Sequence, residues 1–160
     1  MDVSGSIPFE RYQGNGRKLL GRPPVGDGTC RRGYGPPVFS ECGTACAYCG
    51  REMGEQYESW LDLSIDHVIP GETVKRLGWP REWVEDIANL VTCCRACNEF
   101  LNGYRVADPP PATTDEFFAL RAQHFVAKRE RVIERHVREH DWYEAWVLSR
   151  QGKAQVDAGQ

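Results

Sequence analysis

The sequence predicts an α+β protein with a small core between a flexible arm and a long helix. Three observations carry this prediction: two Cys-x-x-Cys pairs, a Gly- and Pro-rich segment before them, and a helical periodicity after them. A chain of 160 residues is ordinarily one domain, and an apolar fraction of 41% suits a globular protein. We expect an arm over 1–44, a core over 45–107, a proline break and helix over 108–150, and a flexible tail over 151–160.

The arm is rich in residues that break helices and strands, so we expect loop or extended structure there. It holds six basic residues against four acidic ones, although the whole chain has a net charge of -3. Cations interspersed with tyrosines can contact phosphates and stack on bases, which makes the arm a candidate nucleic-acid contact. A solvated extension wrapped on the domain is the alternative. The candidate contacts are Arg17, Lys18, Arg31 and Arg32.

The core is defined by the pairs Cys46 with Cys49 and Cys94 with Cys97. A two-residue spacer lets both thiolates of a pair turn onto one ion, and four thiolates form a closed tetrahedral zinc site. Cys93 offers a second register with Cys97, but the spacing of Cys94 matches the first pair and is preferred. The seven cysteines are an odd number, and their paired spacing favours a reducing, cytoplasmic setting over a disulfide framework.

Between the cysteine pairs, alternating apolar and polar residues predict a strand over 57–68 that Pro70 ends. Residues 50–56 are suited to a hairpin turn into this strand. A helical turn is expected over 72–77, and a short helix beginning at Pro80 is expected over 80–87. Residues 94–105 are predicted to continue as a helix.

The C-terminal helix follows a stiff run of three prolines. Thr113 and Glu116 open it in the manner of a capping box, and apolar residues recur at helical spacing to about Glu139. Trp142 and Trp146 either extend the helix or dock its end. Its charges balance, which favours a structural role, and its length permits a homodimer interface without requiring one. No apolar run reaches the length of a membrane span, so we expect no membrane association.

The core motifs are two cysteine pairs, an Asp-His pair before a proline, and an Asn-Leu-Val run: Cys46-x-x-Cys49, Asp66-His67-x-x-Pro70, Asn89-Leu90-Val91 and Cys94-x-x-Cys97-Asn98. This pattern resembles the HNH endonuclease family with a ββα-metal fold and a four-cysteine zinc site. It is particularly similar to the phage junction-resolving endonucleases, which also place Asn directly after the last zinc cysteine. The resemblance covers about a third of the chain. It implies a two-strand hairpin ending at Asp66-His67 and a helix bearing Asn98, joined at their bases by zinc.

The resemblance also implies roles for four residues. Asp66 and Asn98 would bind one catalytic Mg²⁺ or Mn²⁺, His67 would be the general base, and Asn89 would orient His67 through loop hydrogen bonds. Independently of the family, oxygen ligands suit such an ion. A neutral imidazole can take a proton near pH 7 without a large change in its pKa.

The sequence departs from the family pattern after Asn98, where many members carry a Lys a few residues later and this chain has none. Asn102, one helical turn beyond Asn98, is a candidate further ligand or partner of a ligand. Arg95 and Arg105 are candidate phosphate contacts. We therefore expect a metal-dependent endonuclease that cleaves DNA, duplex or branched, to 3′-hydroxyl and 5′-phosphate ends. The alternative is a non-catalytic zinc module that binds nucleic acid or protein.

Overall fold

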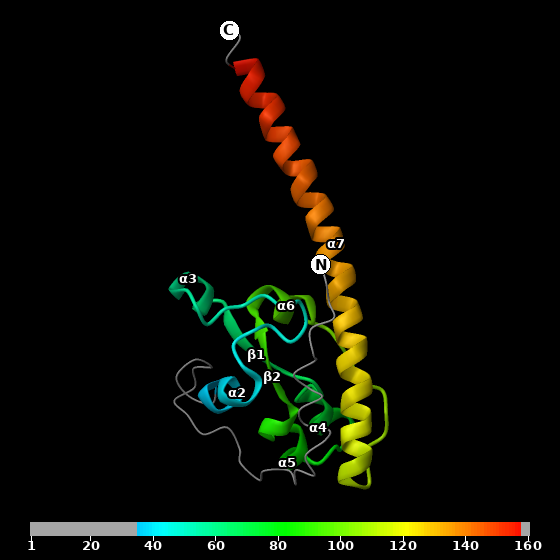
Figure 1. Ribbon diagram of the computed structural model, residues 1–160. Helices are drawn as coiled ribbons and strands as arrows, with labels where there is room; N and C mark the ends of the chain where they lie inside the picture. The colour runs from blue at the N-terminus through cyan, green and yellow to red at the C-terminus, as the bar shows by residue number, and fades with distance from the viewer. Residues whose placement is uncertain (1–34, 158–160) are drawn as a thin grey trace.

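A two-stranded antiparallel sheet lies at the centre of the structure (Figure 1). The computed structural model describes the backbone of residues 35–157 and the side chains of residues 35–150. Strand β1 (Leu63–His67) pairs with β2 (Leu90–Cys94), and His67 lies opposite Leu90. Helix α6 (Arg95–Phe100) follows β2 directly. The strand–strand–helix order confirms the predicted α+β core.

The sheet differs in detail from the expected hairpin. The predicted strand over 57–68 begins with a helical turn, α3 (Tyr57–Trp60), and only β1 is extended. The Asp-His pair ends the first strand of the sheet rather than the second, and residues 50–56 contribute a single bridge between Ala45 and Glu52. Strand β2 is buried along its whole length, so it lacks the alternation that reveals a strand with one solvated face.

Three short helices connect the strands: α4 (Glu72–Leu77), α5 (Arg81–Val84) and the 3₁₀ turn η1 (Ile87–Asn89). The helical turn over 72–77 is confirmed, and Gly78 ends it with a φ of 75°. Helix α5 is shorter than predicted, and Pro80 caps it rather than forming its first turn. The buried Trp79 between α4 and α5 packs edge-on against Phe117 of the long helix.

Helix α6 is also shorter than the predicted 94–105. It ends at Phe100, and the chain turns through Gly103, whose φ of 78° is a conformation that favours glycine. Asn98 is therefore helical, as expected, whereas Asn102 lies in the turn beyond the helix. The prediction that Asn102 lies one helical turn beyond Asn98 on the same helix is therefore wrong.

Part of the predicted arm is a helix, α2 (Gly35–Cys42). Its prolines fall in the first turn, where a missing backbone N–H costs nothing. The buried side chains Val38 and Cys42 pack against Ile65 and Leu90 of the sheet. The loop prediction is thus wrong for 35–42, and the candidate contacts Arg17, Lys18, Arg31 and Arg32 lie outside the described residues.

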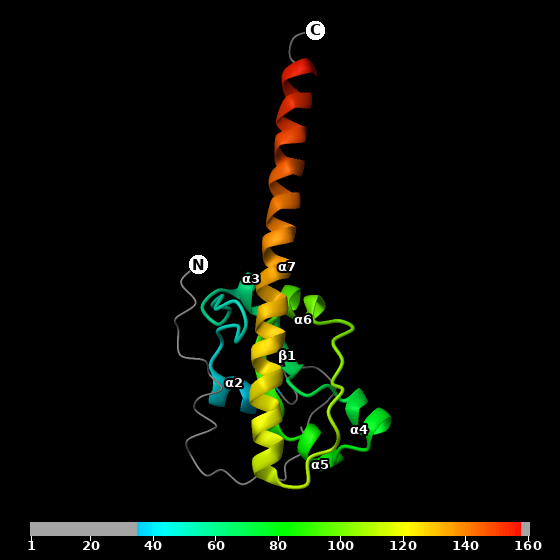
Figure 2. The same ribbon diagram turned by 90° about the vertical axis from the view of Figure 1, so that its right-hand side faces the viewer.

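The longest element is α7 (Thr114–Asp157), which lies on the opposite side of the sheet from α2 (Figure 1). Its start matches the prediction in part: the Thr113 hydroxyl accepts a hydrogen bond from Glu116 N (3.2 Å), but the Glu116 carboxylate accepts from Ala112 N (2.7 Å). Figure 2 shows its first half crossing the domain and its second half projecting beyond it.

The two halves of α7 differ in burial. Phe117, Phe125 and Val132 are at most 1% exposed, whereas Trp142 is 66% and Tyr143 is 55% exposed. The helix continues well past Glu139, where its apolar stripe ends, so Trp142 and Trp146 extend the helix rather than dock its end. Across the described part of the chain, no helix combines the length and apolarity needed to cross a membrane.

Candidate functional site

The four paired cysteines meet at the base of the sheet. The sulfur atoms of Cys46, Cys49, Cys94 and Cys97 all lie within 4.8 Å of one another. A tetrahedral zinc ion with Zn–S bonds of about 2.3 Å places its sulfurs about 3.8 Å apart, and the Cys49 and Cys94 sulfurs are 3.9 Å apart. The donor set and its spacing fit a zinc ion. We call this cluster the four-cysteine centre.

Backbone hydrogen bonds shape the first cysteine pair into a knuckle. Gly50 N donates to Cys46 O (2.9 Å), and Gly50 has a φ of 76°, which a glycine adopts without strain. Ala47 N donates to Thr92 O (2.9 Å), so the knuckle is tied to β2. These backbone hydrogen bonds therefore place the thiols of Cys46 and Cys49 beside the second cysteine pair.

Cys93 does not belong to the cluster. It is fully buried in the core, and burial raises the pKa of its thiol well above the ordinary value. Adjacent strand residues point to opposite faces of a sheet, so Cys93 and Cys94 cannot both face one ion. The register with Cys94 is the one that the structure contains.

A pocket of about 240 Å³ opens where β1 ends. It brings together five of the residues proposed from the sequence: Asp66, His67, Asn98, Asn102 and Arg105. Tyr104 and Lys128 are among the other residues that line it. We call it the Asp-His pocket. Arg95, the remaining candidate phosphate contact, is exposed at the start of α6 and does not line it.

The carboxylate of Asp66 is held through one of its oxygens. Asp66 Oδ2 accepts hydrogen bonds from the Tyr48 hydroxyl (2.5 Å) and from Lys128 Nζ (2.7 Å). Among the described residues, none donates to Asp66 Oδ1. Asn98 donates through Nδ2 to the Ser64 hydroxyl (2.9 Å), and its Oδ1 likewise receives no hydrogen bond from the described chain. Two oxygens lining one pocket therefore keep their capacity to bind a hard cation such as Mg²⁺.

His67 is half-buried beside this carboxylate. Burial lowers the pKa of His67 below its ordinary value of 6.5, Lys128 adds to the effect, and the carboxylates of Asp66 and Glu85 oppose it. The imidazole is consequently neutral at pH 7. It makes no hydrogen bond to any described side chain, so its basic nitrogen is available to a water in the pocket.

Asn89 clamps the loop that follows His67. Its side-chain oxygen accepts from Ile69 N (2.9 Å), and its amide nitrogen donates to Ile69 O (2.8 Å) and Val84 O (2.7 Å). Its backbone carbonyl accepts from Val68 N (2.9 Å). Asn89 is fully buried and contacts the loop, not the imidazole.

Lys128 is the pocket residue that sequence reasoning missed. It comes from α7, and its Nζ donates to Asp66 Oδ2 and to His67 O (2.6 Å) although it lies 62 residues from Asp66. The signal available in the sequence was a lysine on the apolar stripe of α7, between Phe125 and Val132. A charged residue on a buried face needs a partner, because burying an unpaired charge is costly.

Two histidines of α7 also contact the domain. His124 Nδ1 is 2.7 Å from the Tyr104 hydroxyl, and His124 Nε2 is 2.8 Å from Asp108 Oδ2, so the three form a chain beside the pocket. His136 Nε2 is 3.3 Å from Cys97 Sγ. A side chain that contacts a metal ligand in this way helps to orient it. The contact of His136 with the cysteine sulfur was not predicted from the sequence.

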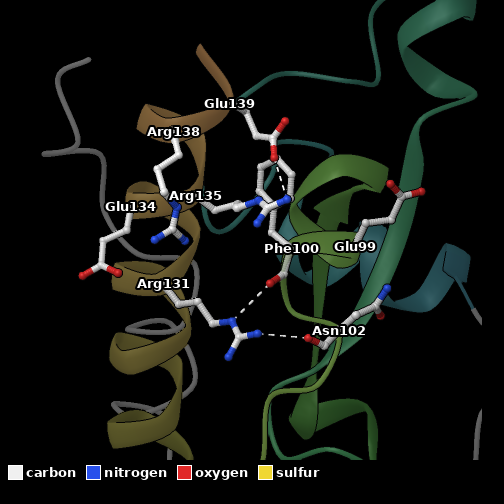
Figure 3. A pocket seen from close by; sticks show the side chains of 8 residues that line it. All are labelled: Glu99, Phe100, Asn102, Arg131, Glu134, Arg135, Arg138 and Glu139. Atoms are coloured by element: carbon white, nitrogen blue, oxygen red, sulfur yellow. Dashed lines mark hydrogen bonds and ion pairs between the residues drawn. The ribbon is translucent and has the colours of Figure 1, made fainter. Parts of the chain in front are cut away.

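A larger groove of about 610 Å³ lies between α6 and α7 and shares Asn102 with the Asp-His pocket (Figure 3). Arg131 spans it and donates to the carbonyls of Phe100 (3.2 Å) and Asn102 (3.0 Å). Arg135 pairs with Glu139 at 2.6 Å. Three arginines and three glutamates line the groove, so its charge is balanced and does not select a phosphate ligand.

Comparison with known proteins assigns this region to a family. No curated protein and no solved structure matches the chain. One family model does, under the description HNH endonuclease, over residues 46–101. The matched segment begins at the first cysteine of the four-cysteine centre and ends just after α6, so it holds both strands, the Asp-His pair and Asn98. Residues 46–101, about a third of the chain, are therefore similar to the HNH endonuclease family, and all four cysteines of the centre lie within this match.

Proposed function

We propose that the protein is a metal-dependent endonuclease that hydrolyses DNA phosphodiester bonds to 3′-hydroxyl and 5′-phosphate ends. The observation that carries the proposal is the meeting of Asp66, His67 and Asn98 in one pocket of the HNH domain. A carboxylate, an imidazole and an amide suit such a hydrolysis, and they come from two separate places in the sequence: the adjacent Asp66 and His67 at the end of β1, and Asn98 in α6.

His67 acts as the general base in this proposal. Its lowered pKa keeps it neutral at pH 7, so it can take a proton from a water as that water attacks phosphorus. Asn89 acts indirectly, because it fixes the loop after His67 and does not contact the imidazole. A well-placed general base typically contributes about 10²- to 10⁴-fold to the rate.

Asp66 and Asn98 would hold the divalent cation, Mg²⁺ or Mn²⁺, through their unused oxygens. When bound, such an ion neutralises charge that develops on the phosphate oxygens during hydrolysis. Tyr48 keeps the carboxylate in one orientation, and Ser64 does the same for the amide. Asn102 and Arg105 line the same pocket and are the candidates for contacts with substrate phosphates.

The four-cysteine centre has a structural role in this proposal. Four protein sulfurs complete a tetrahedral zinc site and leave no open position for substrate. Cys97 immediately precedes Asn98, so an ion at the centre would fix the start of α6 and with it the amide. Reduced cysteines at such a centre fit a cytoplasmic setting.

DNA, duplex or branched, is the proposed substrate. Junction cleavage would need two copies of the chain, and the projecting half of α7, with exposed Trp142 and Trp146, is the candidate contact between them. Sedimentation equilibrium on the full chain tests the homodimer, and a Trp142→Ala variant should shift the equilibrium towards monomer. A monomer at every concentration would remove the dimer and leave the nuclease proposal intact.

The first experiment is cleavage of supercoiled plasmid in EDTA, Mg²⁺ or Mn²⁺ by the wild type and two histidine variants. His67→Ala should lose about 10²-fold or more in rate while zinc content and circular dichroism stay unchanged. His140→Ala is the matched control, because His140 is exposed on α7 and paired with Glu144, away from the pocket.

Equal cleavage by the wild type and His67→Ala would contradict the assignment of the base. If the wild type binds plasmid but cuts it in no metal, with zinc bound and the fold intact, the better function is a non-catalytic zinc module that binds nucleic acid.

A further inference from the structure

We propose that Lys128 is a positioning residue of the Asp-His pocket, whose ammonium group holds the Asp66 carboxylate and the His67 backbone so that one carboxylate oxygen remains for a divalent cation. The inference rests on the proposed nuclease function. It adds α7, which lies outside the segment that the family model matches, to the groups that build the site.

The lysine is built into the site rather than lying near it. Its side chain is 1% exposed, and its ammonium group has three N–H donors. One donates to Asp66 Oδ2 (2.7 Å) and another to His67 O (2.6 Å). The nitrogen also lies 5.4 Å from the centre of the Tyr104 ring, within the range of a cation–π contact. Each group that faces the ammonium is therefore an acceptor or a π face.

These contacts fix both members of the Asp-His pair. Asp66 is held through its side chain and His67 through its backbone carbonyl, so a single cation sets the end of β1. With the Tyr48 hydroxyl, Lys128 gives Asp66 Oδ2 two strong donors and leaves Oδ1 without one among the described residues. A cation entering the pocket would meet one oxygen of the carboxylate, not both.

Packing holds the lysine in place. Phe125, three residues before it, stacks on Tyr48 with ring centres 5.3 Å apart, and Val132, four residues after it, is fully buried. His124, one turn earlier, is tied to Tyr104. Since the helix is anchored on either side of Lys128, the ammonium needs no rearrangement to reach Asp66.

A merely structural ion pair and a positioning residue predict different results. Removal of a structural pair lowers stability and leaves the folded site as it was. Removal of a positioning cation takes away one of the two donors to Asp66 Oδ2 and a positive charge from the pocket, so a divalent cation should bind more tightly. The rate should fall at the same time, because the carboxylate and His67 are no longer held.

The test compares Lys128→Met, Lys128→Gln and Lys128→Arg in the full, zinc-loaded chain. Free Mn²⁺ is counted by electron paramagnetic resonance to obtain the dissociation constant, and single-turnover cleavage gives the rate and the DNA dependence separately. We expect Lys128→Met to bind Mn²⁺ about threefold or more tightly and to cleave about tenfold or more slowly. Lys128→Arg, which keeps the charge, should return both values towards wild type. Arg135→Met is the control, since it removes a cation from α7 that does not line the pocket.

Wild-type Mn²⁺ affinity and wild-type rate in Lys128→Met would overturn the proposal, and so would a loss of stability with neither value changed. If Lys128→Met fails to retain zinc and helical content, the comparison of Lys128→Gln with Lys128→Arg decides: the neutral variant must bind Mn²⁺ more tightly than the charged one. The binding measurement needs no cleavage. A wild type that binds Mn²⁺ but cuts no DNA therefore ends the nuclease proposal without ending the test of Lys128.

Discussion

The four-cysteine centre is closed, whereas the Asp-His pocket is open. The centre uses four donors of one kind, two from a short turn and two from the junction of β2 with α6, and three of them are at most 2% exposed. The pocket uses donors of different kinds and keeps about 240 Å³ of space in front of them. A structural ion needs a complete set of local ligands, while a reactive site needs polar groups with unused capacity. Such groups must be held by buried bonds from elsewhere, as Tyr48 and Lys128 hold Asp66.

Helix α7 contacts both the four-cysteine centre and the Asp-His pocket with residues of one helix face. His124, Lys128 and His136 are spaced so that each contacts a different part of the domain: Tyr104 beside the pocket, Asp66 within it, and Cys97 of the four-cysteine centre. Residues four apart on a helix lie on the same side, so the three contacts form a row. The helix is therefore part of the site's support and not an appendage.

The largest expected effect comes from breaking the four-cysteine centre. Cys94→Ser should lose zinc and the cooperative fold, because binding of a structural zinc ion contributes about 10 kcal/mol or more to folding. Elemental analysis for zinc and thermal unfolding followed by circular dichroism measure this. Cys93→Ala is the matched control, since it changes the neighbouring buried thiol and should retain one zinc per chain. Loss of zinc from Cys93→Ala with retention in Cys94→Ser would mean that the cluster has the other register.

The next largest effect on stability distinguishes the buried first half of α7 from its projecting second half. Phe125→Ala should lower the free energy of unfolding by about 3–5 kcal/mol, because a fully buried ring stacked on Tyr48 is replaced by a cavity. Tyr143→Ala, in the projecting half, should change it by less than about 0.5 kcal/mol. Urea titrations of both variants give the two values. A large loss in Tyr143→Ala would contradict this prediction and would indicate that the projecting half is covered in solution.

The contrast between the four-cysteine centre and the Asp-His pocket also explains how much of each could be predicted from the sequence. The zinc ligands follow from Cys-x-x-Cys spacing, which is a local property of the chain. Asp66, His67 and Asn98 lie within the same motif set and were proposed with it. Lys128 could not be paired with Asp66 in this way, because their contact depends on how α7 packs across the sheet. Its one local sign, a lysine on an apolar stripe, predicts a partner without naming it.

The helices and strands that were predicted wrongly differ from the prediction for physical reasons of the same kind. Strand β2 is short and buried on both faces, so its residues do not alternate. Helix α2 begins with glycine and two prolines, which usually indicate a loop, and its stability comes from Val38 and Cys42 packing on the sheet. The end of α7 was set at the loss of apolar periodicity near Glu139, but no proline follows to stop the helix. In each case tertiary packing or the absence of a stop signal outweighed the local pattern.

A smaller effect on stability is expected when Asn89, which holds the loop after His67, is replaced. Asn89→Ala should lower the free energy of unfolding by about 2–4 kcal/mol, because Ile69 N and two buried carbonyls lose their partners. It should also slow plasmid cleavage, since the loop after His67 is released. Asn102→Ala is the control for stability: Asn102 is exposed, and its change should stay within about 0.5 kcal/mol. Equal stability of the two variants would show that the clamp is dispensable to the fold.

The smallest effect is a displacement of the pH profile, and it concerns the pocket alone. His67 must be neutral to accept a proton, and burial holds its pKa below the ordinary value of 6.5. As the pH falls, kcat/KM should therefore decline with a midpoint below pH 6.5. Lys128 lowers the pKa of His67, so Lys128→Gln should move this decline to higher pH. Zinc content measured across the same range is the control, because protonation of the thiolates would release the structural ion and mimic the loss of activity. A decline whose midpoint lies above pH 6.5 in the wild type, with zinc still bound, would mean that another group with a higher pKa limits the reaction and that His67 is not the base.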